Sequence, residues 1–325
     1  MPPTPTINTP QTCPSGQSSR VRQLDELTIN WHITEACNYR CQYCYAQWKD
    51  QPDSRELFHS LGNSTKLLSK LFYFFHPEND NNPLRTMLKW NKLRLNIAGG
   101  EPSILNQKLL QICKTANEIG FELSIISNGS KLSRDLIEML APIVNCIGIS
   151  IDSQTPETNK DIGRLDQKGN LLNVAELSAN LQLARKINPQ ISVKLNTVVN
   201  KLNSDQNMNA LVSQIRPDRW KILRVLPVIN EALMVSDKQF ESYLSRHRAF
   251  RPIQCIEDND AMSESYLMVD PYGRFFQNQP PSQGEGYVYS RSIISVGAEE
   301  AFSQVKLDSK RYLHRYTDDC LEEVL

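Results

Sequence analysis

The sequence predicts an α/β fold in which six parallel strands form a partial barrel, open on one side. Short apolar segments alternate with amphipathic segments of helical spacing between residues 27 and 227. This alternation is typical of parallel strands joined by right-handed crossovers. Six units are fewer than the eight of a closed barrel. Polar or glycine-rich groups follow the strands, at the edge where such folds carry their chemistry.

Each strand is predicted from a short run rich in β-branched and other apolar residues. The predicted strands are 27–33, 93–98, 122–127, 146–151, 191–199 and 220–227. The helices between them repeat apolar residues at intervals of three and four. They are predicted at 54–76, 106–119, 133–141, 171–187 and 204–215. Gly120 suits the left-handed residue that ends a helix.

The two ends of the chain depart from this repeat, which gives a prediction for the domains. Residues 1–24 are rich in Pro, Thr and Ser, so we predict a disordered tail. Residues 25–235 form the predicted partial barrel. After them come a predicted helix at 237–249 and an alternating strand at 265–270. We predict that residues 236–325 form a C-terminal extension that covers the mouth of the barrel.

Composition excludes several classes of protein. Lys+Arg and Asp+Glu are equal at 36 each, whereas a general nucleic-acid binder is usually strongly basic. No apolar run approaches the roughly 20 residues that span a bilayer, and the N-terminal tail lacks the apolar core of a signal peptide. We therefore expect a cytoplasmic monomer with no membrane anchor and no direct nucleic-acid binding.

Three of the eight cysteines, Cys37, Cys41 and Cys44, lie together in the pattern C-x3-C-x2-C. Three thiolates can hold a [4Fe–4S] cluster and leave one iron open for another ligand. A structural zinc site usually has four ligands, and no second cysteine pair matches, although His32 or His59 could complete such a site. Thiols that are close by accident are the third interpretation.

Cations recur near the strands at two-residue spacing, which places each pair on one face of its strand. Charged side chains that point into a barrel are costly to bury unless an anion lies between them. A phosphate chain is such an anion, and arginine matches its geometry. Solvent-facing strand ends are the alternative. The pairs are Arg94 with Asn96, Lys194 with Asn196, and Arg219 with Lys221.

Taken together, these residues resemble a known family. The cysteine pattern after a first strand, followed by Gly99-Gly100-Glu101-Pro102, resembles the radical S-adenosylmethionine (SAM) superfamily. Further short motifs, in order from about Leu27 to Arg315, resemble the viperins and viperin-like antiviral enzymes. These motifs are Cys37–Cys41, Ser127-Asn128-Gly129-Ser130, Ile162-Gly163-Arg164, Lys194–Asn200, Arg219-Trp220-Lys221 and Ser265-Tyr266-Leu267.

The resemblance implies a reaction. A [4Fe–4S] cluster and SAM generate a 5′-deoxyadenosyl radical, which takes the 4′ hydrogen of a ribonucleoside triphosphate. The 3′ hydroxyl leaves as water, and the 3′-deoxy-3′,4′-didehydro product terminates viral RNA chains. CTP or UTP is the favoured substrate, with GTP as an alternative. An external electron donor of the flavodoxin, ferredoxin or reductase type is implied as a partner.

The resemblance also implies roles for individual residues. Tyr266 supplies a proton or hydrogen atom late in the reaction; a packing role for this tyrosine is the alternative. The cluster ligands are Cys37, Cys41 and Cys44. The SAM-binding residues are Tyr43, Gly99, Gly100, Glu101, Ser127, Asn128, Ser150 and Arg164. The substrate-binding residues are Arg94, Asn96, Lys194, Asn196, Arg219, Lys221, Asn259 and Arg315.

The sequence departs from the family in two places. The amphipathic helix of animal viperins is replaced by the Pro/Thr tail, and the family's basic stretch is here Gln277–Ser282, which has no cation. A radical SAM enzyme acting on a peptide or a cofactor precursor is a second hypothesis. A non-catalytic protein that keeps a cluster or zinc for structure is a third.

Overall fold

The computed structural model describes residues 22–44, 49–226, 231–258, 264–278 and 287–316. Across these ranges, ten strands form one sheet in the order β10-β9-β8-β1-β2-β3-β4-β5-β6-β7. Their bounds are β1 Arg22–His32, β2 Leu88–Ala98, β3 Glu122–Ser127, β4 Cys146–Ser150, β5 Ser192–Val199, β6 Arg219–Arg224, β7 Gln254–Glu257, β8 Leu267–Val269, β9 Arg274–Asn278 and β10 Tyr287–Ser292.

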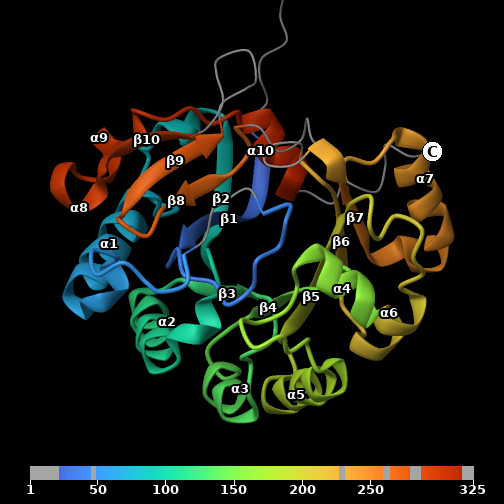
Figure 1. Ribbon diagram of the computed structural model, residues 1–325. Coiled ribbons are helices and arrows are strands. Elements are labelled where there is room, and N and C mark those ends of the chain that lie inside the picture. The colour runs from blue at the N-terminus through green and yellow to red at the C-terminus, as the bar shows by residue number, and fades with distance from the viewer. Residues whose placement is uncertain (1–21, 45–48, 227–230, 259–263, 279–286, 317–325) are drawn as a thin grey trace, which may run out of the picture.

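Strands β1 to β6 are the six predicted strands, and they pair in parallel in chain order. The sheet curves without closing on itself, so the predicted open partial barrel is confirmed (Figure 1). Two more parallel strands extend the run, because β7 pairs with β6 and β8 pairs with β1. Strands β9 and β10 continue the sheet in antiparallel pairs. Strands from both sides of the predicted boundary at 235 thus belong to one sheet.

Helices surround the outer face of the sheet (Figure 1). Single 3-10 turns lie at Leu57–His59, Pro83–Thr86, Pro102–Leu105, Glu231–Leu233 and Arg248–Ile253. The α-helices are α1 Leu61–Phe74, α2 Gln107–Ile119, α3 Arg134–Leu140, α4 Pro156–Ile162, α5 Val174–Ile187, α6 Asn209–Ile215, α7 Asp237–Arg246, α8 Ile293–Val296, α9 Ala298–Phe302 and α10 Ser309–Tyr316.

Several helix boundaries differ from the prediction because side chains cap the helices locally. The predicted helix at 54–76 is divided at Ser60, whose hydroxyl accepts the backbone N–H of Asn63 and starts α1. Helix α5 begins only after Asn173, which caps it in the same way. Gly120 adopts the left-handed conformation after α2, with φ of 117°, as the sequence predicted.

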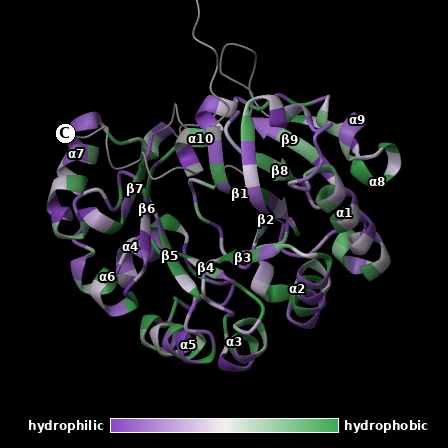
Figure 2. Ribbon diagram, turned by 180° about the vertical axis from the view of Figure 1, so that it is seen from behind, coloured by the Kyte–Doolittle hydropathy of each residue, from purple (hydrophilic) through white to green (hydrophobic). Residues whose placement is uncertain are grey.

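The outer helices carry both hydrophilic and hydrophobic residues, as Figure 2 shows. Helix α1, for example, buries Leu67, Leu68 and Leu71. The outward side chains of the strands meet these helices, and Leu27 and Ile29 of β1 are completely buried. The apolar core therefore lies between the sheet and its helices.

Because side chains alternate along a strand, the other face of each strand points into the barrel. That face is polar here. It carries Thr28 and Asn30 on β1, and Asn96 and Asn196 on β2 and β5, and all four line an internal cavity. The barrel interior is thus a polar space instead of a packed apolar core.

Helix α10 lies between the two ends of the parallel run, beside β1 and β7 (Figure 1). The hydroxyl of Tyr312 accepts the N–H of Thr28 on β1 at 2.7 Å and donates to its carbonyl oxygen at 3.0 Å. One turn later, Arg315 reaches Glu257 at the end of β7, at 2.5 Å. The C-terminal extension therefore covers the opening of the barrel and adds side chains to its interior.

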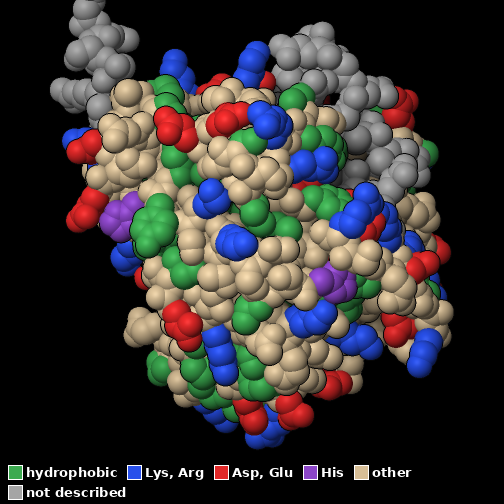
Figure 3. Space-filling model, turned by 90° about the vertical axis from the view of Figure 1, so that its left-hand side faces the viewer, with side chains coloured by type: hydrophobic (Ala, Val, Ile, Leu, Met, Phe, Trp, Pro, Cys, Tyr) green, Lys and Arg blue, Asp and Glu red, His purple; other side chains and the backbone are tan. Residues whose placement is uncertain are grey.

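In the described ranges, no helix has both the length and the apolarity to cross a membrane. On the outer face seen in Figure 3, acidic and basic side chains are intermixed. The strand cations that the sequence analysis predicted to bind phosphate lie inside the barrel instead.

Candidate functional site

A cavity of about 530 Å³ occupies the barrel interior. It extends from the cysteine loop after β1 to Glu26 and Asp218 near the opposite strand ends. Every site residue predicted from the sequence lines this cavity, except Asn259, which lies outside the described residues. Segments up to 278 residues apart in the chain, from Cys37 to Arg315, thus meet at one site.

The three clustered cysteines form no disulfide bond with any described residue, and they line the same end of the cavity. Their loop is held by backbone bonds to the end of α4, where the N–H of Arg40 donates to Gly163 at 3.1 Å. Burial, partly opposed by the N–H of Tyr39, raises the pKa of Cys37 to about 12, and neighbouring Cys41 and Cys44 add to the rise. Such a thiol ionises when a cation binds it.

The donor set fits an iron–sulfur cluster better than a single ion. In the described part of the chain, no three His, Cys, Asp or Glu side chains lie close enough to hold one metal ion. A cluster is larger than an ion and spreads its ligands more widely, and its usual ligands are cysteine thiolates. The zinc alternative with His32 or His59 finds no such grouping.

Gly99 and Gly100 allow the end of β2 to lie against the cysteine loop. The N–H of Gly100 donates to the carbonyl of Thr34 at 2.8 Å. A Cβ on Gly100 would lie 1.9 Å from the carbonyl oxygen of Ala36, and Gly99 has a φ of 121°. Only glycine fits both conditions. The glycine pair therefore positions the loop that carries the cysteines.

Glu101 is completely buried beside this loop. Its carboxylate accepts the Ser103 hydroxyl at 2.5 Å, the Ser127 hydroxyl at 2.7 Å and the Asn128 N–H at 2.6 Å. Burial raises its pKa, and these hydrogen bonds oppose the rise. Glu101 thus links the ends of β2 and β3. Ser127 and Asn128, like Glu101, were predicted to bind SAM, and Glu101 holds both of them in place.

A second buried network contains Arg164 and Asp152. Nη1 of Arg164 is 3.1 Å from the Asp152 carboxylate and 3.0 Å from the Tyr43 hydroxyl, and the same nitrogen is 4.0 Å from Sγ of Cys41. Nη2 donates to the carbonyl of Ser150. The sequence analysis predicted a strand at 146–151 and named Ser150 as a site residue, but it did not name Asp152 as one. The residues next to such a carboxylate in the sequence do not reveal that it pairs with a buried arginine from another segment.

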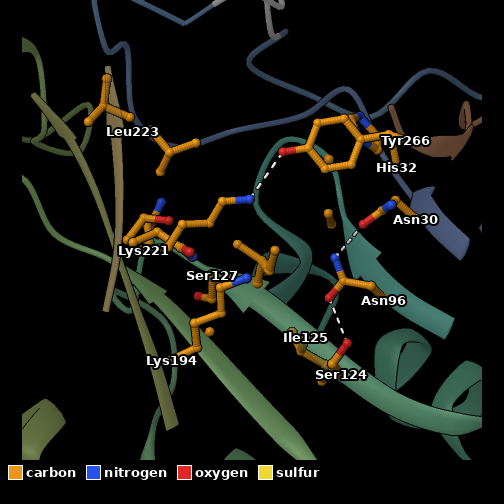
Figure 4. Close-up of a pocket in the computed structure, with 18 of the residues that line it drawn as sticks. Asn30, His32, Asn96, Ser124, Ile125, Ser127, Lys194, Lys221, Leu223 and Tyr266 are labelled. Atoms are coloured by element: carbon orange, nitrogen blue, oxygen red, sulfur yellow. Dashed lines mark hydrogen bonds between the residues drawn. The ribbon is translucent and has the colours of Figure 1, made fainter. Parts of the chain in front are cut away.

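On the wall formed by β1, β2 and β3, three uncharged side chains, those of Asn30, Asn96 and Ser124, form a hydrogen-bonded chain. Nδ2 of Asn96 donates to Asn30 at 2.8 Å, and its carbonyl accepts the Ser124 hydroxyl at 2.7 Å (Figure 4). Nδ2 of Asn30 continues the chain to the carbonyl of Leu267 on β8 at 3.2 Å. These amides are therefore fixed before any ligand enters.

The opposite wall carries the cations. Figure 4 shows Lys194 and Lys221 extending into the cavity from β5 and β6. Burial, together with the charge of Lys221, lowers the pKa of Lys194 to about 8. Within the described residues, the Lys194 ammonium forms no hydrogen bond or salt bridge. Its charge is therefore available to a ligand.

Arg94 and Arg219 lie farther from the cysteine loop. Arg94 pairs with Glu26, where Nη2 is 2.7 Å from Oε2, and its buried Nη1 has no hydrogen-bond partner among the described residues. Nη2 of Arg219 donates to Sγ of Cys255 at 3.2 Å. Arg94 thus lines the cavity with one buried guanidinium donor unsatisfied.

Glu257, at the end of β7, is a site residue that the sequence analysis missed. Its carboxylate pairs with Lys221, lies 2.5 Å from Arg315 and accepts the Tyr266 hydroxyl at 3.2 Å. Burial would raise its pKa, but Lys221 and Arg315 outweigh burial and lower it to about 2. The only sequence signal was its place two residues before Asn259.

Positive charge therefore exceeds negative charge at this end of the cavity, although the chain as a whole is neutral. An excess of buried positive charge is unfavourable, so the arrangement is suited to an anion with several charges. The cations are Arg94, Lys194, Arg219, Lys221 and Arg315, and the nearby carboxylates are Glu26, Asp218 and Glu257.

Comparisons with known proteins agree with this geometry. Residues 31–207 match the Radical SAM superfamily. S-adenosylmethionine-dependent nucleotide dehydratases from Pseudoalteromonas ulvae and Psychrobacter lutiphocae are 40% and 38% identical, each over 90% of this chain and 94% and 95% of their own lengths. S-adenosylmethionine-dependent nucleotide dehydratase RSAD2 from Oncorhynchus mykiss is 29% identical over 89% of this chain and 78% of its own.

Solved structures show the same fold at low identity. The structure of anSMEcpe with bound AdoMet has a TM-score of 0.60 at 12% identity, over 91% of this chain and 84% of the other. Streptococcus suis SuiB bound to S-adenosylmethionine has a TM-score of 0.57 at 11% identity, over 89% and 67%.

Fold, cysteine loop and family match together define a radical SAM enzyme, whose cofactors are a [4Fe–4S] cluster and S-adenosylmethionine. Within that superfamily, the chain belongs to the S-adenosylmethionine-dependent nucleotide dehydratases, the viperin-like family that its motifs resemble. It is therefore a radical SAM dehydratase, a lyase. The family resemblance drawn from the sequence is confirmed.

Gly100→Ala is expected to disturb the cysteine loop, since the added Cβ would overlap the Ala36 carbonyl. We expect the free energy of unfolding to fall by at least about 2 kcal/mol, as for other backbone clashes at special positions. Thermal unfolding and iron content after anaerobic reconstitution measure this. Gly62→Ala is the matched control, because its nearest neighbour would be 3.9 Å away. Equal iron content and stability in both variants would contradict the role given to Gly100.

The lowered pKa of Lys194 predicts how anion binding depends on pH. Below its pKa of about 8 the ammonium is charged, and above it the empty site loses that charge. The affinity for inorganic triphosphate should therefore fall about tenfold between about pH 7.5 and 9.5. A tenfold fall corresponds to a shift of about one unit in the pKa of Lys194 when the anion binds. Isothermal titration calorimetry measures it. Lys194→Met should bind more weakly with a flatter pH profile, and an unchanged slope in that variant would disprove the assignment.

Proposed function

We propose that this enzyme converts a pyrimidine ribonucleoside triphosphate, CTP or UTP, to its 3′-deoxy-3′,4′-didehydro analogue. The observation that carries the proposal is one cavity with a three-cysteine loop at one end and five cations toward the other. A ribonucleoside triphosphate matches this division, since its ribose separates a polyanionic tail from the base. The cavity, about 530 Å³, lies within the range typical of small-molecule sites.

The cysteine end of the cavity is proposed to hold the cofactors. Cys37, Cys41 and Cys44 would bind the cluster. When bound, the cluster and SAM supply a 5′-deoxyadenosyl radical next to the substrate. Glu101 and the end of β3 that it organises would receive the SAM amino group. Arg164, Tyr43 and Ser150, which already form one network, would enclose the rest of SAM.

The cationic wall is proposed to bind the triphosphate. Arginine presents forked donors that match phosphate oxygens, and lysine adds a mobile point charge. Lys194, which extends into the cavity, is the donor with room for new contacts, and Arg94 lines the same cavity. Lys221 and Arg315 would share their contacts between phosphates and Glu257. Asn96 and Asn196 would contact the ribose or the neighbouring phosphate.

Tyr266 is proposed as the residue that completes the reaction. Once the 4′ hydrogen has been removed, loss of the 3′ hydroxyl as water takes one proton, and formation of the 3′,4′ double bond takes one electron. The phenolic O–H of Tyr266 would supply both as it breaks, the proton to the departing hydroxyl and the electron to the sugar. An external one-electron donor, with a proton from solvent, would then restore the tyrosine. A product without a 3′ hydroxyl cannot be extended, so we propose that it terminates viral RNA chains.

Anaerobically reconstituted and reduced enzyme should show which nucleotide is the substrate. With SAM and CTP, UTP, GTP or ATP in separate reactions, we expect 5′-deoxyadenosine to rise strongly with a pyrimidine nucleotide. A product lighter by one water should accompany it. Mass spectrometry and quantitative chromatography measure both.

Other results of this assay would change the proposal. If only GTP gives product, the proposed reaction stands, but the substrate carries guanine and not a pyrimidine base. Slow SAM cleavage that no nucleotide stimulates would contradict the nucleotide reaction and favour a peptide or cofactor precursor as substrate. Cys41→Ala should abolish cleavage in every case, because it removes a cluster ligand.

A further inference from the structure

A carboxylate at the centre of a proposed phosphate site requires an explanation. Glu257 is 4% exposed and lies among three cationic side chains, those of Lys221, Arg315 and Lys194. A buried negative charge at this point repels the triphosphate that the cations attract. Glu257 therefore weakens the binding step, so its contribution should lie in another step.

The geometry around Tyr266 suggests which step. The Tyr266 hydroxyl donates to Oε2 of Glu257 at 3.2 Å and accepts from Nζ of Lys221 at 3.2 Å. The Arg315 guanidinium lies 3.7 Å from the centre of the Tyr266 ring. Both hydrogen-bonding positions of the phenol are thus occupied and one ring face is covered. Figure 4 shows the Tyr266 hydroxyl directed toward Lys221 across the cavity.

Glu257 connects these three neighbours. Oε1 pairs with Lys221, and Oε2 accepts from both Arg315 and Tyr266. Glu257 comes from β7 and Lys221 from β6, whereas Arg315 comes from α10 and Tyr266 directly precedes β8. These four elements lie on both sides of the barrel opening. Without the carboxylate, Lys221 and Arg315 would repel each other across the phenol.

We propose that Glu257 is the positioning residue of Tyr266: its carboxylate holds the phenolic O–H, directly and through Lys221 and Arg315, in the orientation from which it serves the substrate. This inference rests on the proposed function and deepens it. The alternative is that Glu257 only neutralises Lys221 and Arg315. The two roles predict different effects on binding and on product formation.

Glu257→Gln separates the two roles. It removes the charge that opposes the triphosphate, so nucleotide should bind as tightly as in the wild type or more tightly. Product formed per 5′-deoxyadenosine should nevertheless fall about tenfold, the size expected when a hydrogen bond to a charged group is lost. Tyr266→Phe should show a similar loss, and the double variant should lose no more than Tyr266→Phe alone. Calorimetry on the reconstituted enzyme measures the Kd separately from turnover.

Glu257→Asp is the second variant, in case glutamine destabilises the buried cations. It keeps the charge but withdraws the carboxylate by one methylene group. We expect nucleotide affinity and thermal stability near those of the wild type, with a reduced ratio of product to 5′-deoxyadenosine and a lower kcat at unchanged KM. Asp270→Asn is the control. It removes another buried carboxylate, 2.6 Å from Arg274, that does not line the cavity, and it should leave the ratio unchanged.

A wild-type ratio in both Glu257 variants would overturn the proposal and leave Glu257 as a counterion. A lowered ratio in Asp270→Asn would also overturn it, because the effect would then be general. If instead the proposed function is wrong, no nucleotide will stimulate SAM cleavage by the wild-type enzyme, so the two failures can be told apart.

Discussion

The structure depends on how positive charge is placed inside an open barrel. Side chains alternate along β1, β2, β5 and β6, so these strands present apolar residues to the helices and polar residues to the interior. Cations held there are unfavourable unless an anion joins them. This requirement explains why a chain of zero net charge has a strongly positive cavity. It also explains why Lys194 has a pKa near 8 when no anion is bound.

Helix α10 completes this arrangement from the far end of the chain. Through Tyr312 it is fixed to β1, and through Arg315 it reaches β7. The opening of the partial barrel thus becomes the place where Arg315, Glu257 and Tyr266 meet. Helix α10 thus places Arg315 beside the proposed catalytic tyrosine, whereas the cysteine loop is built by β1, β2 and α4.

The sequence was sufficient where the signal is local. It predicted the six central strands, the cysteine loop and the cations of β2, β5 and β6, because spacing along one segment determines them. It missed β7, which is only four residues long and flanked by polar residues, and with it Glu257. It also missed Asp152, whose pairing with the predicted site residue Arg164 is apparent only once α4 is placed. Both are carboxylates paired with distant cations, and such pairs exist only in the folded chain.

The central claim is that the cavity recognises the phosphate chain of its substrate. Calorimetric titration of the reconstituted enzyme with cytidine, CMP, CDP and CTP tests it most directly. Affinity should rise with each added phosphate, and the gain should shrink at high salt, because charge–charge attraction provides it. If cytidine or CMP binds as tightly as CTP, the interior cations do not bind a phosphate chain, and this account of the site is wrong.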